Sequence, residues 1–348
     1  MSEKNLGIIG GGQLGSLLSA AAKKLNIKTT IYCNDIDAPA KHFCDNFIFG
    51  EYGDKKKIHK FIRDVDIITY EFENIPYETL NEMNQLKPVL PKPSVNRLIQ
   101  HRIAEKDFIN KLNIRTTRYA YIEKKSDIET LEDFLPGILK TTTMGYDGKG
   151  QYPIKKTEDI DNINIDFSKG YILEKLVKLK KEISVIVTRY GINSYEIYEP
   201  IENTHQDQIL KHSVIPALIS KKILDQSKDW ATRIAEELKY IGTLCVEFFI
   251  DRNENLYVNE IAPRVHNSGH LTINAYNVSQ FENHVRAVCS LERIPLKKIS
   301  NAKMVNLIGN QIEIYRKNPN LNKNEFFFDY LKKDVKEKRK MGHITTLM

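Results

Sequence analysis

The stretch that decides the fold of this chain is Cys245–His270, with the sequence CVEFFIDRNENLYVNEIAPRVHNSGH. Two runs of apolar and aromatic residues, Leu244–Ile250 and Leu256–Ile261, flank the polar segment Asp251–Asn255, and this pattern predicts a β-hairpin. The segment Ile261–His270, which leaves the second strand, is too rich in arginine, histidine and asparagine for a simple strand exit. Such side chains at one strand end predict an anion-binding site.

Two glutamates of this hairpin are predicted to face each other. If Asp251 pairs with Leu256 across the turn, Glu247 lies directly opposite Glu260, and both side chains point to one face. Facing carboxylates repel each other unless a cation lies between them, and a few oxygen ligands suit Mg²⁺ that keeps waters and substrate phosphates. Asn259 adds a neutral oxygen beside Glu260. The hairpin is therefore predicted to hold Mg²⁺, and the alternative is a solvated acidic hairpin without a ligand.

The composition is that of an ordinary globular protein with two or three domains. Of the 348 residues, 41% are hydrophobic and 28% are charged. The 52 lysines and arginines exceed the 45 aspartates and glutamates by 7, and part of the excess lies in Lys332–Lys340. This surplus suits phosphorylated small molecules better than nucleic acid, because the basic segment is short and is interrupted by Asp334 and Glu337.

Cysteine usage and hydropathy predict a cytoplasmic location. The chain has four cysteines without C-x-x-C spacing, which favours reduced thiols. No signal peptide precedes Leu6, and no apolar run approaches the roughly 18 residues of a membrane span. We therefore expect a soluble protein with neither a membrane nor a nucleic-acid partner.

The N-terminal region predicts a nucleotide-type α/β domain. A short apolar strand, Leu6–Ile9, leads into the glycine turn Gly10–Gly15 and a helix over Ser16–Leu25. A second strand, Lys28–Tyr32, is followed by Asp35 about 20 residues after the turn, which completes a dinucleotide-binding pattern. An NAD-dependent dehydrogenase is thus one open alternative, although N–H groups at such a helix start could bind any phosphate.

Further strands alternate with helices and predict a small parallel sheet. Ligands of such sheets bind at the carboxyl ends of the strands, where Glu71 and Glu73 follow the strand that begins at Asp66. For each glutamate the alternative is a plain loop carboxylate. A long helix over Val95–Leu112 is predicted to mark the domain junction and carries Arg102, which could reach a phosphate.

A lysine before a glycine-rich loop predicts a triphosphate site. Lys140 ends the apolar strand Gly137–Lys140, and Thr141–Gln151 follows with three glycines and Lys149. A triphosphate needs one such point charge and a flexible cover of backbone donors. The loop lacks the ending of a Walker motif, and its alternative is an ordinary hairpin turn. The next strand, Tyr171–Val177, could offer backbone groups to a nucleotide base.

Several strings of the sequence resemble one family closely. They are GGGQLG, YEFEN, QHR..EK, GYDGKGQ, NEIAPRVHNSGH and the terminal RKMGHIT, and they span Leu6–Thr345. Together they resemble the N5-carboxyaminoimidazole ribonucleotide synthases of the ATP-grasp superfamily. The resemblance implies an α/β protein (α+β overall) with the ATP-grasp fold. It further implies an N-terminal Rossmann-like parallel-sheet domain over 1–100, an ATP-grasp domain over 101–290 and a C-terminal mixed segment over 291–348. The lid subdomain would span about 113–177.

The resemblance also implies an activity and its ligands. Such enzymes are ligases of purine biosynthesis, usually homodimers, that use ATP, Mg²⁺ and bicarbonate to carboxylate 5-aminoimidazole ribonucleotide. For ATP it implies Arg102, Lys140, Gly145, Tyr146, Asp147, Gly148, Lys149, Gly150, Gln151, Glu174, Lys175, Leu176, Val177, Glu182, His205, Asn259 and Glu260. For Mg²⁺ it implies Glu247 and Glu260. For the ribonucleotide it implies Gly12, Gln13, Glu73, Asp147 and Arg264, with Lys333, Lys336, Arg339 and Lys340 on its phosphate. For the chemistry it implies Asp147, Lys149, Arg264 and His266.

One departure from the family bears on the phosphate site. The family often has Tyr-Gly-Lys and Pro-Gly before its final Arg-Lys, whereas this chain has Leu331-Lys332-Lys333 and Glu337-Lys338. The position of Lys333 therefore departs from the family's pattern, whereas Arg339 and Lys340 match it.

The expected mechanism is activation of bicarbonate by phosphoryl transfer. Carboxyphosphate would form under Lys140 and the glycine loop, be held by the fork of Arg264, and break down to CO₂ beside an amine that Asp147 orients. Closure of Tyr146–Gly150 would exclude water. The alternatives are another ATP-grasp carboxylate–amine ligase, a formate-using purine enzyme, or the dehydrogenase, which leaves Lys140 and the paired glutamates without a role.

Overall fold

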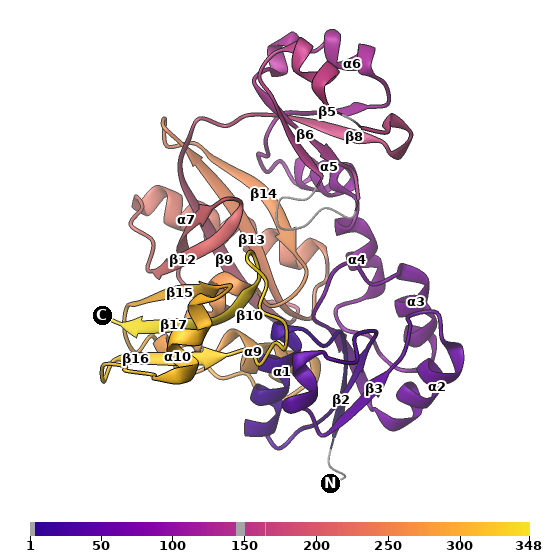
Figure 1. Ribbon diagram of the computed structural model, residues 1–348, viewed down its shortest axis with the longest axis vertical. Coiled ribbons are helices and arrows are strands. Elements are labelled where there is room, and N and C mark those ends of the chain that lie inside the picture. The colour runs from indigo at the N-terminus through magenta and orange to yellow at the C-terminus, as the bar shows by residue number, and fades with distance from the viewer. Residues whose placement is uncertain (1–3, 144–149, 164) are drawn as a thin grey trace.

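The computed structural model describes residues 4–143, 150–163 and 165–348, and three sheets organise them (Figure 1). A small upper lobe carries one sheet, and the larger body below it carries the other two. None of the described helices is long and apolar enough to cross a membrane.

The N-terminal sheet is parallel, as the alternation of strands and helices predicts. Its strand order is β3-β2-β1-β4, and all of its pairings are parallel. Its strands are β1 (Asn5–Ile9), β2 (Lys28–Cys33), β3 (Asn46–Phe49) and β4 (Ile67–Tyr70), and the helices along it are α1 (Gln13–Lys24), α2 (Lys55–Asp64) and α3 (Tyr77–Leu86). Most apolar residues of β1, β2 and β4 are almost fully buried, so the glycine turn and the end of β4 are held on a rigid base.

The upper lobe is a separate antiparallel sheet with its own apolar core. Its strand order is β5-β8-β6-β7. The elements are β5 (Tyr119–Ile122), α6 (Lys125–Glu129), β6 (Gly137–Thr141), β7 (Gln151–Ile154) and β8 (Tyr171–Lys175). Lys140 pairs with Gln151 across the antiparallel strands β6 and β7. The predicted ligands Gly145, Tyr146, Asp147, Gly148 and Lys149 lie outside the described residues.

The large sheet of the body has the order β14-β13-β9-β11-β12-β15-β17-β16, with β10 paired to β9, in the described part of the chain. Its strands are β9 (Leu179–Gly191), β10 (Ser194–Ile197), β11 (Ile201–Gln206), β12 (Ile209–Ile215), β13 (Gly242–Asp251), β14 (Leu256–Ala262), β15 (Ala302–Ile308), β16 (Glu325–Asp329) and β17 (Lys340–Leu347). Because β12 pairs with β15, the C-terminal strands extend the sheet that holds the hairpin.

The two faces of β9 and β13 differ because alternate residues point to opposite sides. Ile183, Val185 and Phe248 pack with Trp230 of α7 (Lys221–Glu237) in one apolar cluster. The other face carries Glu182, Ser184 and Glu247 together with apolar residues that pack under 3₁₀-helix η5 (Asn267–Leu271). Helices α8 (Thr272–Ala275), α9 (Gln280–Val288) and α10 (Gln311–Lys317) complete the body.

Two sequence predictions need correction. The long helix predicted over Val95–Leu112 is two helices, α4 (Pro93–Ile99) and α5 (Arg102–Lys111). The break falls at Gln100–His101, where the Nδ1 atom of His101 accepts the backbone N–H of Ala104 at 3.4 Å and begins the new helix. No proline or glycine marks this break, so the sequence pattern gives no sign of it.

The second correction concerns the register of the central hairpin. Glu247 does pair with Glu260, as predicted, but the register shifts beside this pair. Phe248 pairs with Val258, so Asn259 is the extra residue of a β-bulge and Leu256 pairs with Ile250 rather than Asp251. The prediction was therefore right at the glutamates and wrong by one residue at the turn.

Candidate active site

Helix α5 lies between the upper lobe and the body (Figure 1), and its side chains contact both parts. Arg102 of α5 reaches Glu260 of β14 at 3.4 Å between Nη1 and Oε2. Lys106, one turn further along, contacts Glu174 of the lobe and the backbone carbonyl oxygen of Asn259 at 3.5 and 3.4 Å. A single helix thus fixes the distance between the lobe and the hairpin.

Three buried side chains form the charged centre of this junction. Glu174 is 4% exposed, and its Oε2 atom lies 3.0 Å from the Nζ atom of Lys140. Burial alone would raise the pKa of Glu174, but Lys106 and Lys140 outweigh it and lower that pKa from 4.5 to about 2. Burial lowers the pKa of Lys106, and the nearby Glu174 opposes that shift. Two lysines therefore stand beside one carboxylate, an arrangement that favours a phosphate.

The paired glutamates of the hairpin are each held by a nitrogen atom of a neighbouring side chain. The carboxylate of Glu247 lies 2.8 Å from Nε2 of His266, and this contact outweighs burial and lowers its pKa to about 2. The side chain of Glu260 is 41% exposed and contacts Arg102. Among the described residues no group of three or more acidic, histidine or cysteine side chains is arranged to hold a metal. Two carboxylates still fit Mg²⁺, because that ion takes its remaining ligands from water and phosphates.

Arg264 and Glu73, both predicted to meet the ribonucleotide, contact each other. The Nη2 atom of Arg264 lies 2.9 Å from Oε1 of Glu73, and its Nε atom bonds the other carboxylate oxygen. The pair raises the pKa of Arg264 and lowers that of Glu73 against the effect of burial. The guanidinium fork predicted to hold carboxyphosphate thus holds a carboxylate of the protein in this structure.

The glycine turn is also filled by a protein carboxylate. Glu71 accepts the backbone N–H groups of Gly12 and Gly15 at 2.7 and 3.0 Å. A Cβ atom at Gly10, which has a φ of +98°, would lie 2.8 Å from the side chain of Glu71. The glycines therefore admit Glu71 at the start of α1, where a dinucleotide phosphate would otherwise bind. The dehydrogenase alternative loses its phosphate site.

A pocket of about 250 Å³ opens beside this turn and is cationic at one end. Its lining includes the glycine turn, Gln13, Lys332 and Arg339. Lys332 donates to the side-chain oxygen of Gln13 at 3.0 Å. The predicted Lys333 and Lys336 are exposed and lie outside this lining. Leu331 has a φ of +57°, which turns the chain so that Lys332 faces Gln13 while Lys333 pairs with Asp37.

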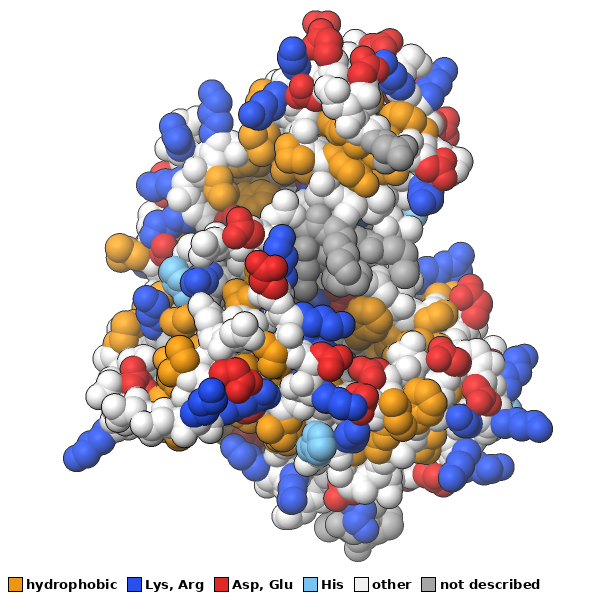
Figure 2. Space-filling model, viewed as in Figure 1, with side chains coloured by type: hydrophobic (Ala, Val, Ile, Leu, Met, Phe, Trp, Pro, Cys, Tyr) orange, Lys and Arg blue, Asp and Glu red, His pale blue; other side chains and the backbone are white. Residues whose placement is uncertain are grey.

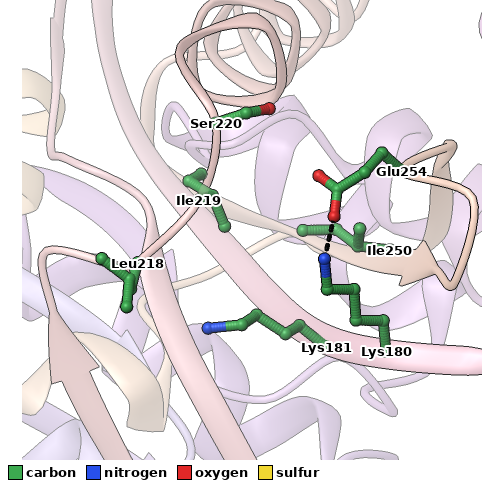
Figure 3. Close-up of a pocket in the computed structure, with 7 residues that line it drawn as sticks. All are labelled: Lys180, Lys181, Leu218, Ile219, Ser220, Ile250 and Glu254. Carbon is green, nitrogen blue, oxygen red and sulfur yellow. Dashed lines mark hydrogen bonds and ion pairs between the residues drawn. The ribbon is translucent and has the colours of Figure 1, made fainter.

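A larger hollow of about 480 Å³ lies elsewhere, under the start of α7 (Figure 3). It contains none of the predicted site residues. Its two lysines are already paired, Lys180 with Glu254 and Lys181 with Glu202. The surface drawn in Figure 2 likewise mixes acidic and basic side chains over the body. The junction of lobe and body is therefore the better candidate for the site.

Comparison with known proteins decides the family. Models of three domains match successive parts of the chain: a ribonucleotide synthetase preATP-grasp domain at 3–100, an ATP-grasp domain at 107–281, and a phosphoribosylaminoimidazole carboxylase C-terminal domain at 302–348. The N5-carboxyaminoimidazole ribonucleotide synthase of Bacillus subtilis is 38% identical over 98% of this chain and 90% of its own length. That of Staphylococcus aureus strain MRSA252 is 36% identical over 98% and 92%. The chain belongs to the N5-carboxyaminoimidazole ribonucleotide synthase family.

Solved structures of this family agree with the fold. An ADP complex of an N5-carboxyaminoimidazole ribonucleotide synthetase superposes with a TM-score of 0.94 at 34% identity, covering 100% of this chain and 94% of the other. The Aspergillus clavatus enzyme in complex with ADP and 5-aminoimidazole ribonucleotide gives 0.91 at 26% identity, over 99% and 94%. The predicted ATP-grasp fold with a parallel N-terminal sheet is thereby confirmed.

Most of the described residues predicted for ATP lie in or next to this junction. Glu182 and His205 are neighbours on β9 and β11, with 2.5 Å between carboxylate and ring nitrogen, and this pairing raises the pKa of His205 against the effect of burial. Lys175, Leu176 and Val177 form the end of β8 and the link into β9, and Gly150 precedes β7 with a φ of +72°. Their roles toward ATP stay predictions.

Sequence reasoning missed two buried charged residues of the site, and it named Glu71 at the strand end without its contacts to the glycine turn. Lys106 is described above, and Glu105 accepts the N–H of Ile261 at 2.6 Å. Burial, followed by the nearby Glu260, raises the pKa of Glu105 to about 8. Both Glu105 and Lys106 stand in the QHR..EK string, whose spacing puts Arg102, Glu105 and Lys106 on one side of a helix. That spacing was the signal available for them.

Proposed function

We propose that this protein is an ATP-dependent ligase that carboxylates 5-aminoimidazole ribonucleotide with bicarbonate and yields N5-carboxyaminoimidazole ribonucleotide, ADP and phosphate. The observation that carries the proposal is the near full-length match to synthases of this name. The geometry supports it, because α5 carries Lys106, which lies with Lys140 beside Glu174 of the lobe, and also carries Arg102, which contacts Glu260 of the hairpin. Another ATP-grasp carboxylate–amine ligase would share these features but not the family match.

Each charged group has a part in the proposed phosphoryl transfer. Lys140 and Lys106 would neutralise charge on the transferred phosphoryl group. Mg²⁺, when bound by Glu247 and Glu260, would supply further charge neutralisation at the phosphate oxygens. Asp147 and Lys149 keep their predicted roles at the amine and the phosphates and lie outside the described residues.

Arg264 and His266 are proposed to bind carboxyphosphate. Arg264 is held against Glu73 by two bonds, so its fork is pre-aligned for a planar anion. An anion that replaces Glu73 would gain the same two bonds in a buried site, where charge-assisted bonds are strong. The Nε2 atom of His266 points to Glu247, which places the ring between this fork and the proposed metal ligand.

The ribonucleotide is proposed to enter the pocket beside the glycine turn. Its phosphate would bind Lys332 and Arg339, with Lys340 next to them, whereas its imidazole would extend past Gly12 and Gln13 toward Glu73. Lys332 thereby replaces Lys333 in the assignment, because Lys332 lines the pocket. A homodimer and a cytoplasmic location remain predictions from the family resemblance and the cysteine pattern.

The test is phosphate release from ATP that requires both bicarbonate and 5-aminoimidazole ribonucleotide. Replacement of Glu247 by Ala should lower the rate by at least about 100-fold, because a bound metal ion contributes several kcal/mol. The matched control is Glu254→Ala in the exposed turn of the same hairpin, which should keep the wild-type rate. Phosphate release without either substrate, or equal rates of the two variants, would contradict the proposal.

A further inference from the structure

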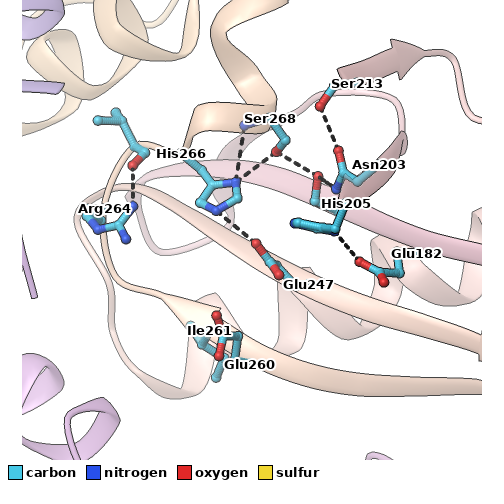
Figure 4. A network of polar contacts seen from close by, with 12 residues as sticks. Glu182, Asn203, His205, Ser213, Glu247, Glu260, Ile261, Arg264, His266 and Ser268 are labelled. Carbon is cyan, nitrogen blue, oxygen red and sulfur yellow. Dashed lines mark hydrogen bonds and ion pairs between the residues drawn. The ribbon is translucent and has the colours of Figure 1, made fainter. Parts of the chain in front are cut away.

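A row of buried polar side chains leads from the site into the large sheet (Figure 4). It begins at Glu247 and His266 and continues across neighbouring strands through Ser268, Ser184, Asn203 and Ser213. The hydroxyl–hydroxyl contact between Ser268 and Ser184 is 2.8 Å, and the contacts of the Asn203 amide to Ser184 and Ser213 are 3.0 and 2.8 Å.

The position of the row in the sheet makes it continuous. Ser184 of β9 pairs directly with Glu247 of β13, and Ser213 of β12 pairs directly with Asn203 of β11. Ser184, Ser213 and Ser268 are fully buried, and Asn203 is 6% exposed. Apolar side chains such as Ile186 and Cys245 pack beside them. Buried hydroxyl groups give little stability over apolar ones, so a complete polar row at this place calls for another reason.

The hydrogen bonds of the row have a direction. The backbone N–H of Ser268 donates to Nδ1 of His266 at 3.3 Å, so this ring nitrogen is an acceptor. The far end agrees, because the hydroxyl of Ser213 donates to Oδ1 of Asn203 and turns the amide nitrogen toward Ser184. Ser184 must then donate to Ser268, and Ser268 to Nδ1 of His266.

An accepting Nδ1 places the ring proton on Nε2, which faces Glu247. One oxygen of Glu247 is then held by a directed N–H bond, and its other oxygen is left to ligate a metal. A histidine with the opposite tautomer would turn a lone pair toward the carboxylate and repel it. The orientation of the Asn203 amide thus determines, through the hydroxyl groups of the row, which ring nitrogen of His266 donates to the proposed metal ligand Glu247.

We propose that Ser184, Asn203, Ser213 and Ser268 act as positioning residues, which orient Glu247 for the Mg²⁺–nucleotide complex by fixing the ring nitrogen of His266 that carries the proton. The inference rests on the proposed function in one respect, the role of Glu247 as a metal ligand. Partners of this kind behind a metal ligand typically contribute 10- to 100-fold to metal affinity.

The experiment compares Ser213→Ala and Asn203→Asp with a matched control, Ser227→Ala. Ser227 is also a fully buried serine, but its hydroxyl bonds the carbonyl of Leu224 within α7, on the other face of the sheet. Binding of Mn²⁺ with ADP is titrated without the ribonucleotide. The nitrogen shifts of the His266 ring are followed by NMR with labelled histidine, assigned by their loss in His266→Gln. Thermal unfolding checks that each variant is folded.

We expect Ser213→Ala to weaken binding of Mn²⁺ with ADP by about 5-fold, since the amide can then turn, and Asn203→Asp by 10-fold or more, since a carboxylate accepts from Ser184 and reverses the row. Both should shift proton occupancy from Nε2 toward Nδ1, and Ser213→Thr should restore both measurements. If Asn203→Asp does not fold, Ser213→Ala and Ser213→Thr decide.

Affinity and ring shifts of Ser213→Ala equal to those of Ser227→Ala would overturn the inference. Failure of the proposed function gives a different result, because the wild-type protein would then bind Mn²⁺ with ADP and release no phosphate in response to the ribonucleotide.

Discussion

Glu71 and Glu174 are both almost fully buried, at 7% and 4% exposure, yet their pKa values shift in opposite directions. Glu71 accepts two backbone N–H groups, and burial outweighs these bonds, so its pKa is raised. Glu174 lies between Lys106 and Lys140, which outweigh burial and lower its pKa to about 2. Neutral donors hold a carboxylate in place without compensating its charge, whereas two cations overcompensate it.

This difference separates a structural carboxylate from one at an anion site. Among the described residues, the hydrogen-bond donors to Glu71 are two backbone N–H groups, and the more distant charges of Arg264 and Lys332 do not outweigh its burial. Around Glu174 the two ammonium groups carry one charge more than the carboxylate, and a triphosphate can share them. The glycine turn and the lysine pair look alike as sequence motifs for phosphate, but only in the lysine pair do two cations contact the carboxylate directly.

The largest expected effect is on the Glu174 pair. Glu174→Gln leaves Lys106 and Lys140 buried side by side without a counter-ion, and we expect a loss of about 3–5 kcal/mol in the free energy of unfolding at pH 7. The matched control is Asp133→Asn, which removes the partner of Arg118 in an exposed ion pair, and it should change stability by less than about 1 kcal/mol. Urea titration measures both. Equal losses would refute the contrast between buried and exposed pairs.

The pH dependence of stability should separate wild type from Glu174→Gln. The folded pKa of Glu174 is about 2 against 4.5 for the free side chain, so its contribution is present above pH 4.5 and is lost as the pH falls toward 2. The stability difference between the two proteins should therefore shrink over that window. A constant difference between pH 5 and pH 2.5, measured by urea titration, would mean that the lysines do not depress this pKa.

Glu71 should give a smaller effect with the opposite dependence on pH. Glu71→Gln keeps one acceptor for the N–H groups of Gly12 and Gly15 but turns its amide nitrogen toward the other, which costs about 1–3 kcal/mol. Because the folded pKa of Glu71 is raised, its ionisation opposes folding as the pH rises above 4.5. The cost of the substitution should thus fall between pH 5 and pH 8. The control is Asp54→Asn, which changes the N-cap carboxylate of α2 that accepts the backbone N–H of Lys57. A cost of Glu71→Gln that is equal at pH 5 and pH 8 would contradict the prediction.

How much of the fold and of the site could be predicted from the sequence depends on how far apart in the chain the contacting residues lie. The hairpin, the parallel N-terminal sheet and the pairing of Glu247 with Glu260 follow from local patterns, and the structure has them. Glu71 on Gly12 and Gly15, and Lys106 on Glu174, join residues 56 or more positions apart. Periodicity carries no information about such contacts. The β-bulge at Asn259 and the break before Arg102 depend on single bonds that no residue pattern announces.

The smallest effect concerns the two adjacent lysines near the glycine turn, one of which lines a pocket while the other is exposed. Lys332 lines the pocket and contacts Gln13, whereas the side chain of Lys333 is 70% exposed and pairs with Asp37. We expect Lys332→Ala to raise the KM for 5-aminoimidazole ribonucleotide about 10-fold, because one charged hydrogen bond to a phosphate contributes about 1.5–3 kcal/mol. Lys333→Ala should change it less than 2-fold, since an exposed pair contributes little. The KM for ATP serves as the internal control and should stay unchanged in both variants. A larger effect at Lys333 would mean that Lys333 binds the phosphate, as the family resemblance implied, and that this segment turns when the ribonucleotide binds.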